Sequence, residues 1–190
     1  MNKNILSDEI NEIIATLKLI LNSENNVFNQ LCLDCKKSLK YGGKIMFCGN
    51  GGSAADSQHL ATELVVRYQK NRKALAAISL TTDTSAITAT GNDFSFKKIF
   101  SRQVEAIGKK EDLLICITTS GNSPNIIEVI RTAKKRGIKC YCFSGNKGGK
   151  IKKILKNIII IPSNKTSVIQ VCEITLGQIM CDYLETSFAK

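Results

Sequence analysis

The sequence lacks the features that mark membrane, secreted or RNA-binding proteins. No apolar run approaches the ~20 residues that a helix needs to cross a bilayer. Residues 1–4 are polar and do not begin a secretory signal. Aromatic residues make up 6% of the chain, tryptophan is absent, and arginine is not interleaved with aromatic side chains. We therefore expect a cytoplasmic protein that binds neither membranes nor nucleic acid.

The chain also lacks a clear framework of disulfides or zinc ligands. It has eight cysteines, of which all but Cys35 lie among apolar neighbours, and a single histidine, His59. Cysteines in such surroundings are typically buried, reduced thiols. The formal net charge of +11 comes largely from lysines dispersed in small groups. We attribute this charge to solvated faces and take it as weak support for an anionic ligand.

What the chain does have is an alternation of short apolar runs with helical patterns. Its 190 residues, 43% of them hydrophobic, fit a single globular domain over 1–190. We expect two helices in the first 40 residues, a short helix at 84–90 and a turn at 91–93. Strands are expected at 44–48, 76–80, 113–117, 139–143 and 158–161, and further helices from the first glycine loop to about 68 and at 100–107, 124–136 and 167–188. This order predicts an α/β three-layer sandwich, with a mostly parallel sheet flanked by helices.

Two loops carry the strongest chemical signal. Residues 48–56 read Cys-Gly-Asn-Gly-Gly-Ser-Ala-Ala-Asp and join an expected strand to an expected helix. Glycines let backbone N–H groups approach an anion closely, and a helix N-terminus adds partial positive charge. Residues 118–123, Thr-Thr-Ser-Gly-Asn-Ser, follow another expected strand. Because ligands of parallel sheets bind at the carboxyl ends of the strands, the two loops predict a site for a phosphorylated small molecule.

His59 and Glu63 stand four residues apart on the helix expected after the first loop, and hence on one face of it. Such a pair stabilises a helix surface by ~0.3 kcal/mol and needs no further function. The same groups also fit proton transfer, because a carboxylate can act as a base and an imidazole can polarise an oxygen or hold a metal. The two residue types alone leave both interpretations open.

Five segments together resemble the phosphoheptose isomerase family of the sugar-isomerase (SIS) superfamily. They are residues 48–53, 58–64, 91–93, 100–104 and 118–123, and the similarity runs in order over nearly the whole chain. The resemblance implies an aldose–ketose isomerase that converts sedoheptulose 7-phosphate to D-glycero-D-manno-heptose 7-phosphate for lipopolysaccharide or capsule. It also implies a homotetramer with active sites at subunit interfaces, often containing zinc, in which the helices of residues 1–40 contribute to oligomer packing.

The resemblance further assigns roles to individual residues. It implies that Glu63 is the catalytic base and that His59 assists it. It implies substrate contacts by Asn50, Gly51, Gly52, Ser53, Asn92, Asp93, Thr118, Thr119, Ser120, Ser123 and Gln170. The hydroxyl residues of the second loop are expected to hold the phosphate. The positions implied for zinc are His59, Glu63, Gln170 and Gln178.

The chain departs from the family in its final helix. The family has a histidine eight residues after the glutamine that matches Gln170, and this chain has Gln178 there. Another common histidine is replaced by Glu173. A glutamine amide cannot exchange protons near neutral pH as histidine does, and it is a poor zinc ligand. A role for zinc therefore stays open.

Three functions stay open at this point. The first is an active isomerase in which Glu63 does most of the proton transfer. The second is a non-catalytic SIS protein that binds a replication-initiator protein. The third is a tetramer with a phosphosugar-sensing or structural role. Because Glu63 is retained, the catalytic site has not been lost wholesale, and we favour the isomerase.

Overall fold

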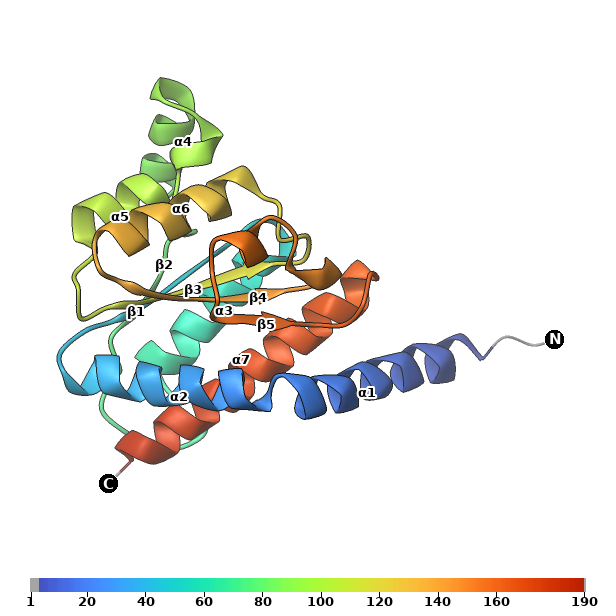
Figure 1. Ribbon diagram of the computed structural model, residues 1–190. Helices are drawn as coiled ribbons and strands as arrows, with labels where there is room; N and C mark the ends of the chain where they lie inside the picture. Colours follow the sequence, from blue (N-terminus) through green and yellow to red (C-terminus); the bar gives the residue numbers. More distant parts are fainter. Residues whose placement is uncertain (1–3, 190) are drawn as a thin grey trace.

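The computed structural model describes residues 4–189, and within them the chain forms a five-stranded parallel sheet in the order β2-β1-β3-β4-β5 (Figure 1). The strands are β1 (Ile45–Gly49), β2 (Ala77–Ser79), β3 (Leu113–Thr118), β4 (Lys139–Ser144) and β5 (Ile158–Ile160). From β1 the chain crosses to β2 at one edge and then returns to β3 on the other side of β1. The predicted α/β fold with a parallel sheet is confirmed.

Helices cover both faces of this sheet (Figure 1). One face carries α2, α3 and α7, with α1 alongside them, and the other carries α5 and α6. The helices are α1 (Ile5–Ser23), α2 (Asn25–Lys40), α3 (Gly52–Val65), α4 (Thr84–Asp93), α5 (Ser101–Ile107), α6 (Pro124–Lys135) and α7 (Thr166–Phe188). Among the described residues, none of them combines the length and apolar character that crossing a bilayer requires.

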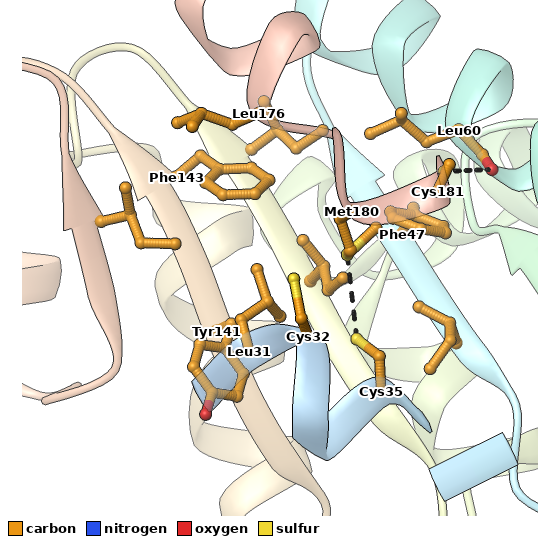
Figure 2. Packing of buried hydrophobic residues seen from close by; sticks show 14 of the residues in the cluster. Leu31, Cys32, Cys35, Phe47, Leu60, Tyr141, Phe143, Leu176, Met180 and Cys181 are labelled. Atoms are coloured by element: carbon orange, nitrogen blue, oxygen red, sulfur yellow. Dashed lines mark hydrogen bonds between the residues drawn. The ribbon is translucent and has the colours of Figure 1, made fainter. Parts of the chain in front are cut away.

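The strands alternate their side chains between the two faces of the sheet. Phe47 and Phe143 pack with α2, α3 and α7, whereas their neighbours in the chain, Cys48 and Cys142, pack with α5 and α6. Every residue of β1 and β3 is buried. A strand that is buried on both faces has a continuous run of apolar residues in the sequence. For this reason the positions of these strands could be predicted from the sequence. Figure 2 shows the cluster on the first face, where Leu31, Leu60 and Leu176 bring three helices onto the sheet.

Some boundaries differ from the predicted ones. The turn predicted at 91–93 is wrong, because α4 continues through these residues to Asp93. Its start is capped by Asp83, whose side chain accepts a hydrogen bond from the backbone N–H of Ala86 at 2.9 Å. Gly91 keeps a negative φ and does not leave the helix. The helix expected to reach residue 68 ends at Val65. The strand expected at 76–80 is shorter, since β2 spans Ala77–Ser79.

All eight cysteines are free and buried, which confirms the prediction of buried thiols without disulfides. Cys32 and Cys35 have C-x-x-C spacing, which marks a metal or redox pair in some proteins. Here both lie on the buried side of α2, and Cys35 Sγ contacts Met180 Sδ at 3.8 Å (Figure 2). Burial raises the pKa of Cys32 to about 12. A thiol that stays protonated is neither a good nucleophile nor a ready metal ligand.

Candidate active site

The two predicted loops lie at the carboxyl ends of β1 and β3, which are adjacent strands. Gly49 of β1 pairs in register with Ile117 of β3, so residues 50–53 and 118–123 leave the sheet next to each other. Between these strands the order of the sheet reverses, since β1 connects toward one edge and β3 toward the other. Sheets of this order bind ligands at that switch point. The fold thus places both loops where a ligand is expected.

The first loop is a tight glycine turn that opens α3. Gly51 has φ +56° and ψ −121°, a backbone conformation that L side chains rarely adopt. The space around it is open, with no atom within 4 Å of the place where a Cβ would lie. A Cβ on Gly52, in contrast, would lie 2.3 Å from the side-chain Nε2 of Gln170. Gln170 from α7 therefore lies against the start of α3 at Gly52, and the next residue, Ser53, is buried.

A residue that sequence reasoning missed, Asn125, ties the two loops together. It stands in the first turn of α6, 1% exposed. Its Nδ2 donates to Asn50 Oδ1 at 2.8 Å, and Asn50 Nδ2 donates to Asn125 Oδ1 at 3.0 Å. The same Asn125 oxygen accepts from the backbone N–H of Ile126. An asparagine just after a helix start gives no signal of such a partner in the sequence.

The second loop surrounds the N-terminus of α6. Thr118 is buried at the end of β3, while Thr119 and Ser120 are half-buried. Ser123 is the N-cap residue of α6, but its side chain makes no capping hydrogen bond. Pro124 has no N–H, and the N–H of Ile126 is bound to Asn125 Oδ1, so the Ser123 hydroxyl and the backbone N–H of Asn125 are the donors available to an anion at this helix start. Ser120 Oγ accepts instead from the backbone N–H of Asn122, at 3.1 Å, which shapes the loop.

A third glycine segment, residues 145–151, braces the second loop. Gly121, with φ +63°, lies so close to it that a Cβ would be 2.4 Å from the backbone oxygen of Gly148. The backbone N–H of Lys150 donates to Asn122 Oδ1 at 3.0 Å. The segment follows β4 directly, so the chain that leaves β4 also helps to hold the second loop in place.

The predicted proton-transfer pair is formed on α3. His59 Nε2 lies 2.9 Å from Glu63 Oε1, and the two side chains are 47% and 18% exposed. Asp56 stands one turn before His59; burial raises the pKa of this carboxyl, and the His59 charge opposes the shift. The imidazole therefore has a carboxyl group on each side along the helix. A base and an imidazole in hydrogen-bond contact are equipped to exchange protons with a ligand.

Glu173 is an acid that the mechanism implied by the resemblance does not use. It is fully buried, and neither of its carboxyl oxygens has a hydrogen-bond partner among the described residues. Burial raises its pKa to about 9, and the negative charge of Asp56, on the neighbouring α3, adds to the shift. Glu173 is therefore a neutral acid at pH 7. The sequence marks its position as unusual, but its burial depends on the packing of α7 against α3.

The structure does not bring all the predicted site residues together. Asn92 Nδ2 donates to Asp93 Oδ1 at 2.8 Å, and both residues are exposed at the end of α4, which projects from the body of the molecule (Figure 1). Gln178 lies half-buried on α7, about two turns beyond Gln170. Within residues 4–189, no hydrogen bond joins Asn92, Asp93 or Gln178 to the His59–Glu63 pair.

The four positions implied for zinc do not form a zinc site within one chain. His59 and Glu63 hydrogen-bond directly to each other, and Gln170 and Gln178 offer amides. Zinc prefers imidazole, thiolate and carboxylate ligands. In the part of the chain that the structure describes, no three His, Cys, Asp or Glu side chains are grouped so that they could hold a metal ion. The donor set therefore falls short of four good ligands.

The chain is similar to known proteins along nearly its whole length. A family model described as "SIS domain" matches residues 10–145. The phosphoheptose isomerase of Paramagnetospirillum magneticum is 49% identical over 95% of this chain and 94% of its own length. Phosphoheptose isomerase 1 of Campylobacter jejuni is 48% identical over 89% of each of the two chains.

Solved structures give the same result for the fold. The phosphoheptose isomerase GmhA from Neisseria gonorrhoeae superposes with a TM-score of 0.90 at 38% sequence identity, covering 98% of this chain and 100% of that one. A phosphoheptose isomerase from Francisella tularensis superposes with a TM-score of 0.92 at 29% identity, covering 98% and 99%.

Proposed function

The chain belongs to the phosphoheptose isomerase family of SIS-domain proteins, and from this premise we propose that it interconverts sedoheptulose 7-phosphate and D-glycero-D-manno-heptose 7-phosphate. The observation that supports this best is the pairing of Asn50 with Asn125. It joins a glycine turn and a hydroxyl-rich loop into one anion-binding edge beside the helix that carries Glu63. We assign the product to heptose synthesis for lipopolysaccharide or capsule.

The second loop is assigned to the phosphate group. The hydroxyls of Thr118, Thr119, Ser120 and Ser123, together with the backbone N–H of Asn125, supply donors where the partial positive charge of α6 is highest. The first loop, Asn50 to Ser53, and the Gln170 amide next to it are assigned to the sugar hydroxyls. Neutral donors and acceptors suit hydroxyls, and open space at Gly51 lets a ligand approach the backbone.

Proton transfer is assigned to Glu63 and His59. The base Glu63 removes a proton from C1 of the ketose, and an enediol forms as the C2 carbonyl oxygen gains a proton. The proton on Glu63 then returns to C2, while O1 loses its proton and becomes the aldehyde oxygen. His59 is the only imidazole in the chain, so it is the group suited to carry the proton between O1 and O2 near neutral pH.

A homotetramer with sites between subunits fits the exposed surface. Large apolar side chains are exposed along α1 and on α7, at Ile5, Leu6, Ile10, Ile14, Leu19, Leu21, Val171 and Ile179. Asn92 and Asp93 lie at the end of α4, away from the loops of their own chain, and we assign them to contacts with a ligand held by a neighbouring subunit. Glu63 stands 11 residues beyond Gly52, about 16 Å along α3. A site that takes Glu63 from a neighbouring subunit would shorten the distance that the substrate has to bridge.

The experiment that tests the proposal is turnover of sedoheptulose 7-phosphate by the purified protein, with Glu63→Gln as a matched variant. We expect wild-type turnover that falls by at least about 100-fold in Glu63→Gln, since general base catalysis contributes that much, while substrate binding measured by calorimetry is retained. An inert wild type that still binds the sugar phosphate would contradict the proposal and favour a sensing role. An inert wild type without binding would favour a role in binding another protein.

A further inference from the structure

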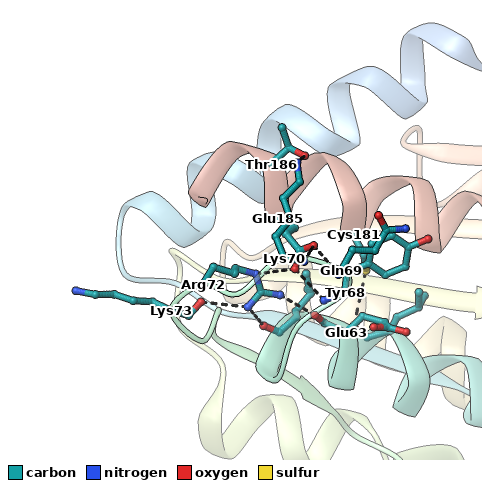
Figure 3. Close-up of polar contacts among 11 residues, drawn as sticks. Glu63, Tyr68, Gln69, Lys70, Arg72, Lys73, Cys181, Glu185 and Thr186 are labelled. Carbon is teal, nitrogen blue, oxygen red and sulfur yellow. Dashed lines mark hydrogen bonds and ion pairs between the residues drawn. The ribbon is translucent and has the colours of Figure 1, made fainter. Parts of the chain in front are cut away.

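A buried polar network joins the loop after α3 to the last turn of α7 (Figure 3). The Glu185 carboxylate, fully buried, accepts hydrogen bonds from three successive backbone N–H groups. Those of Tyr68, Gln69 and Lys70 lie at 2.8, 2.6 and 2.7 Å from its oxygens. The Arg72 guanidinium forms an ion pair with the same carboxylate, with 3.4 Å between Nε and Oε1. The network therefore fixes the loop to the far end of α7.

Arg72 also reaches back to the end of α3. Its Nη2 donates to the backbone oxygen of Glu63 at 2.7 Å, and its Nη1 donates to the backbone oxygen of Leu64 at 2.8 Å. The Arg72 side chain is 1% exposed. A planar guanidinium holds two acceptors at once in a fixed geometry, which a lysine ammonium cannot reproduce.

The end of α3 depends on such a partner. The last four carbonyl groups of a helix have no donor within it, and the partial negative charge collects there. The last turn of α3, which ends at Val65, contains no basic residue. Arg72, from the loop that follows, brings the positive charge and donates to the carbonyl groups of Glu63 and Leu64, and the backbone N–H of Leu75 also donates to that of Leu64, at 3.0 Å. Glu63 stands only two residues before the helix ends, where helices readily fray.

Burial alone would raise the pKa of Glu185, but the backbone N–H groups of residues 68–70 and the charge of Arg72 outweigh burial and hold that pKa below its ordinary value. Glu185 therefore stays ionised at neutral pH and keeps Arg72 in place.

We infer that Arg72, held by Glu185, is a positioning residue for the base Glu63. The inference rests on the proposed function, because it assigns Glu63 the role of base. Through the carbonyl groups of Glu63 and Leu64, Arg72 fixes the backbone that carries the Glu63 side chain and its contact with His59. Displacement of a reacting group by about 1 Å can cost 100-fold in rate. The contacts of Arg72 with the backbone of Glu63 and Leu64 therefore matter for turnover, although Arg72 does not touch the substrate.

The test variant is Arg72→Lys, which keeps a positive charge beside Glu185 but loses the paired contacts to the two carbonyl groups. We expect kcat to fall by at least about 10-fold while KM stays within about twofold, because substrate contacts are untouched. His59 is the chain's single histidine, so its imidazole signals in a proton NMR spectrum can be assigned without ambiguity. We expect its imidazole signals to change chemical shift in the variant, a readout that does not depend on activity.

The chain offers a matched control at Asp112. Its carboxylate is buried like that of Glu185, accepts from the backbone N–H groups of Lys44 and Lys109, and pairs with Lys44 Nζ at 2.6 Å. It stands just before β3, at the opposite end of the sheet from the loops. We expect Asp112→Asn to lower the melting temperature without changing kcat or the His59 signals.

Three results would overturn the inference. One is a folded Arg72→Lys protein with wild-type kcat and unchanged His59 signals. Another is an Asp112→Asn protein that loses kcat as strongly as Arg72→Lys does, since general loosening would then explain both. The third is a change of KM by more than about twofold in Arg72→Lys, since substrate contacts would then be affected. If the wild type itself does not turn over the sugar phosphate, the proposed function fails, and the His59 signals still decide whether Arg72 positions Glu63.

Discussion

The side-chain amides of Asn50 and Asn125 hydrogen-bond to each other in both directions, at 3.0 and 2.8 Å, across the gap between β1 and β3. One amide belongs to the glycine turn and the other to the start of α6. Each uses its oxygen and its nitrogen on the other, so the pair sets the spacing of the two loops. The partner of Asn50 is almost completely buried, which keeps water from competing for the contact.

The Asn125→Asp variant would test this coupling. It keeps the oxygen that accepts from the backbone of Ile126 but removes the donor to Asn50 and adds a buried negative charge beside the phosphate loop. We expect KM for the sugar phosphate to rise at least about 10-fold, because the carboxylate repels the anionic ligand and leaves Asn50 Oδ1 without its donor, which costs roughly 1–3 kcal/mol. Steady-state kinetics measures the change, and an unchanged melting profile with unchanged KM would contradict it.

Gly51→Ala is expected to be harmful although the space around Gly51 is open. The conformation at φ +56° and ψ −121° excludes a Cβ on backbone grounds, at a cost of about 1–3 kcal/mol. We expect both a lower free energy of unfolding and a loss of kcat/KM as the turn rearranges. Gly91→Ala is the matched control, since Gly91 lies in α4 with negative φ and open space. We expect that change to be neutral or to stabilise the protein by up to about 1 kcal/mol.

We expect the burial of Glu173 to make the protein less stable as pH rises. Burial raises its pKa from 4.5 to about 9 in the folded protein, so between these values the folded state holds a proton that the unfolded state has released. The free energy of unfolding therefore falls as pH rises through this window. We expect Glu173→Gln to be more stable than wild type by about 2–4 kcal/mol at pH 8 and by far less at pH 5. Urea unfolding at both pH values measures this, and an equal difference at the two would refute it.

Zinc should have little effect on the wild type and more on a variant with a third good ligand. We expect added zinc or a chelator to change wild-type turnover by less than about twofold, because His59 and Glu63 bring only two favoured ligands. Gln178→His adds an imidazole at the position where the resemblance implies one. Calorimetric titration with zinc should show tighter binding in this variant. Tight zinc binding by the wild type would contradict the conclusion that these side chains do not form a zinc site.

Local patterns predict the strands, the layers and the two loops, because each depends on neighbouring residues. Continuous apolar runs mark strands buried on both faces, and glycine with hydroxyl residues marks the turns. The contacts that complete the site join distant segments, and the sequence carries no sign of them. Asn50 with Asn125 and Arg72 with Glu63 are examples. The α4 error has a local cause, since Gly91 has the composition of a turn but the capped helix continues through it.

The burial of every cysteine determines how the thiols of the protein can be chemically modified. Alkylating reagents and oxidants reach a sulfur atom only when the chain opens, because all eight thiols are covered in the folded state. Labelling rates of the native protein therefore report the population of opened forms, without any engineered probe. The same arrangement carries a hazard. Each opening in an oxidising medium exposes several thiols at once, and cross-linking between them would turn a reversible fluctuation into permanent loss.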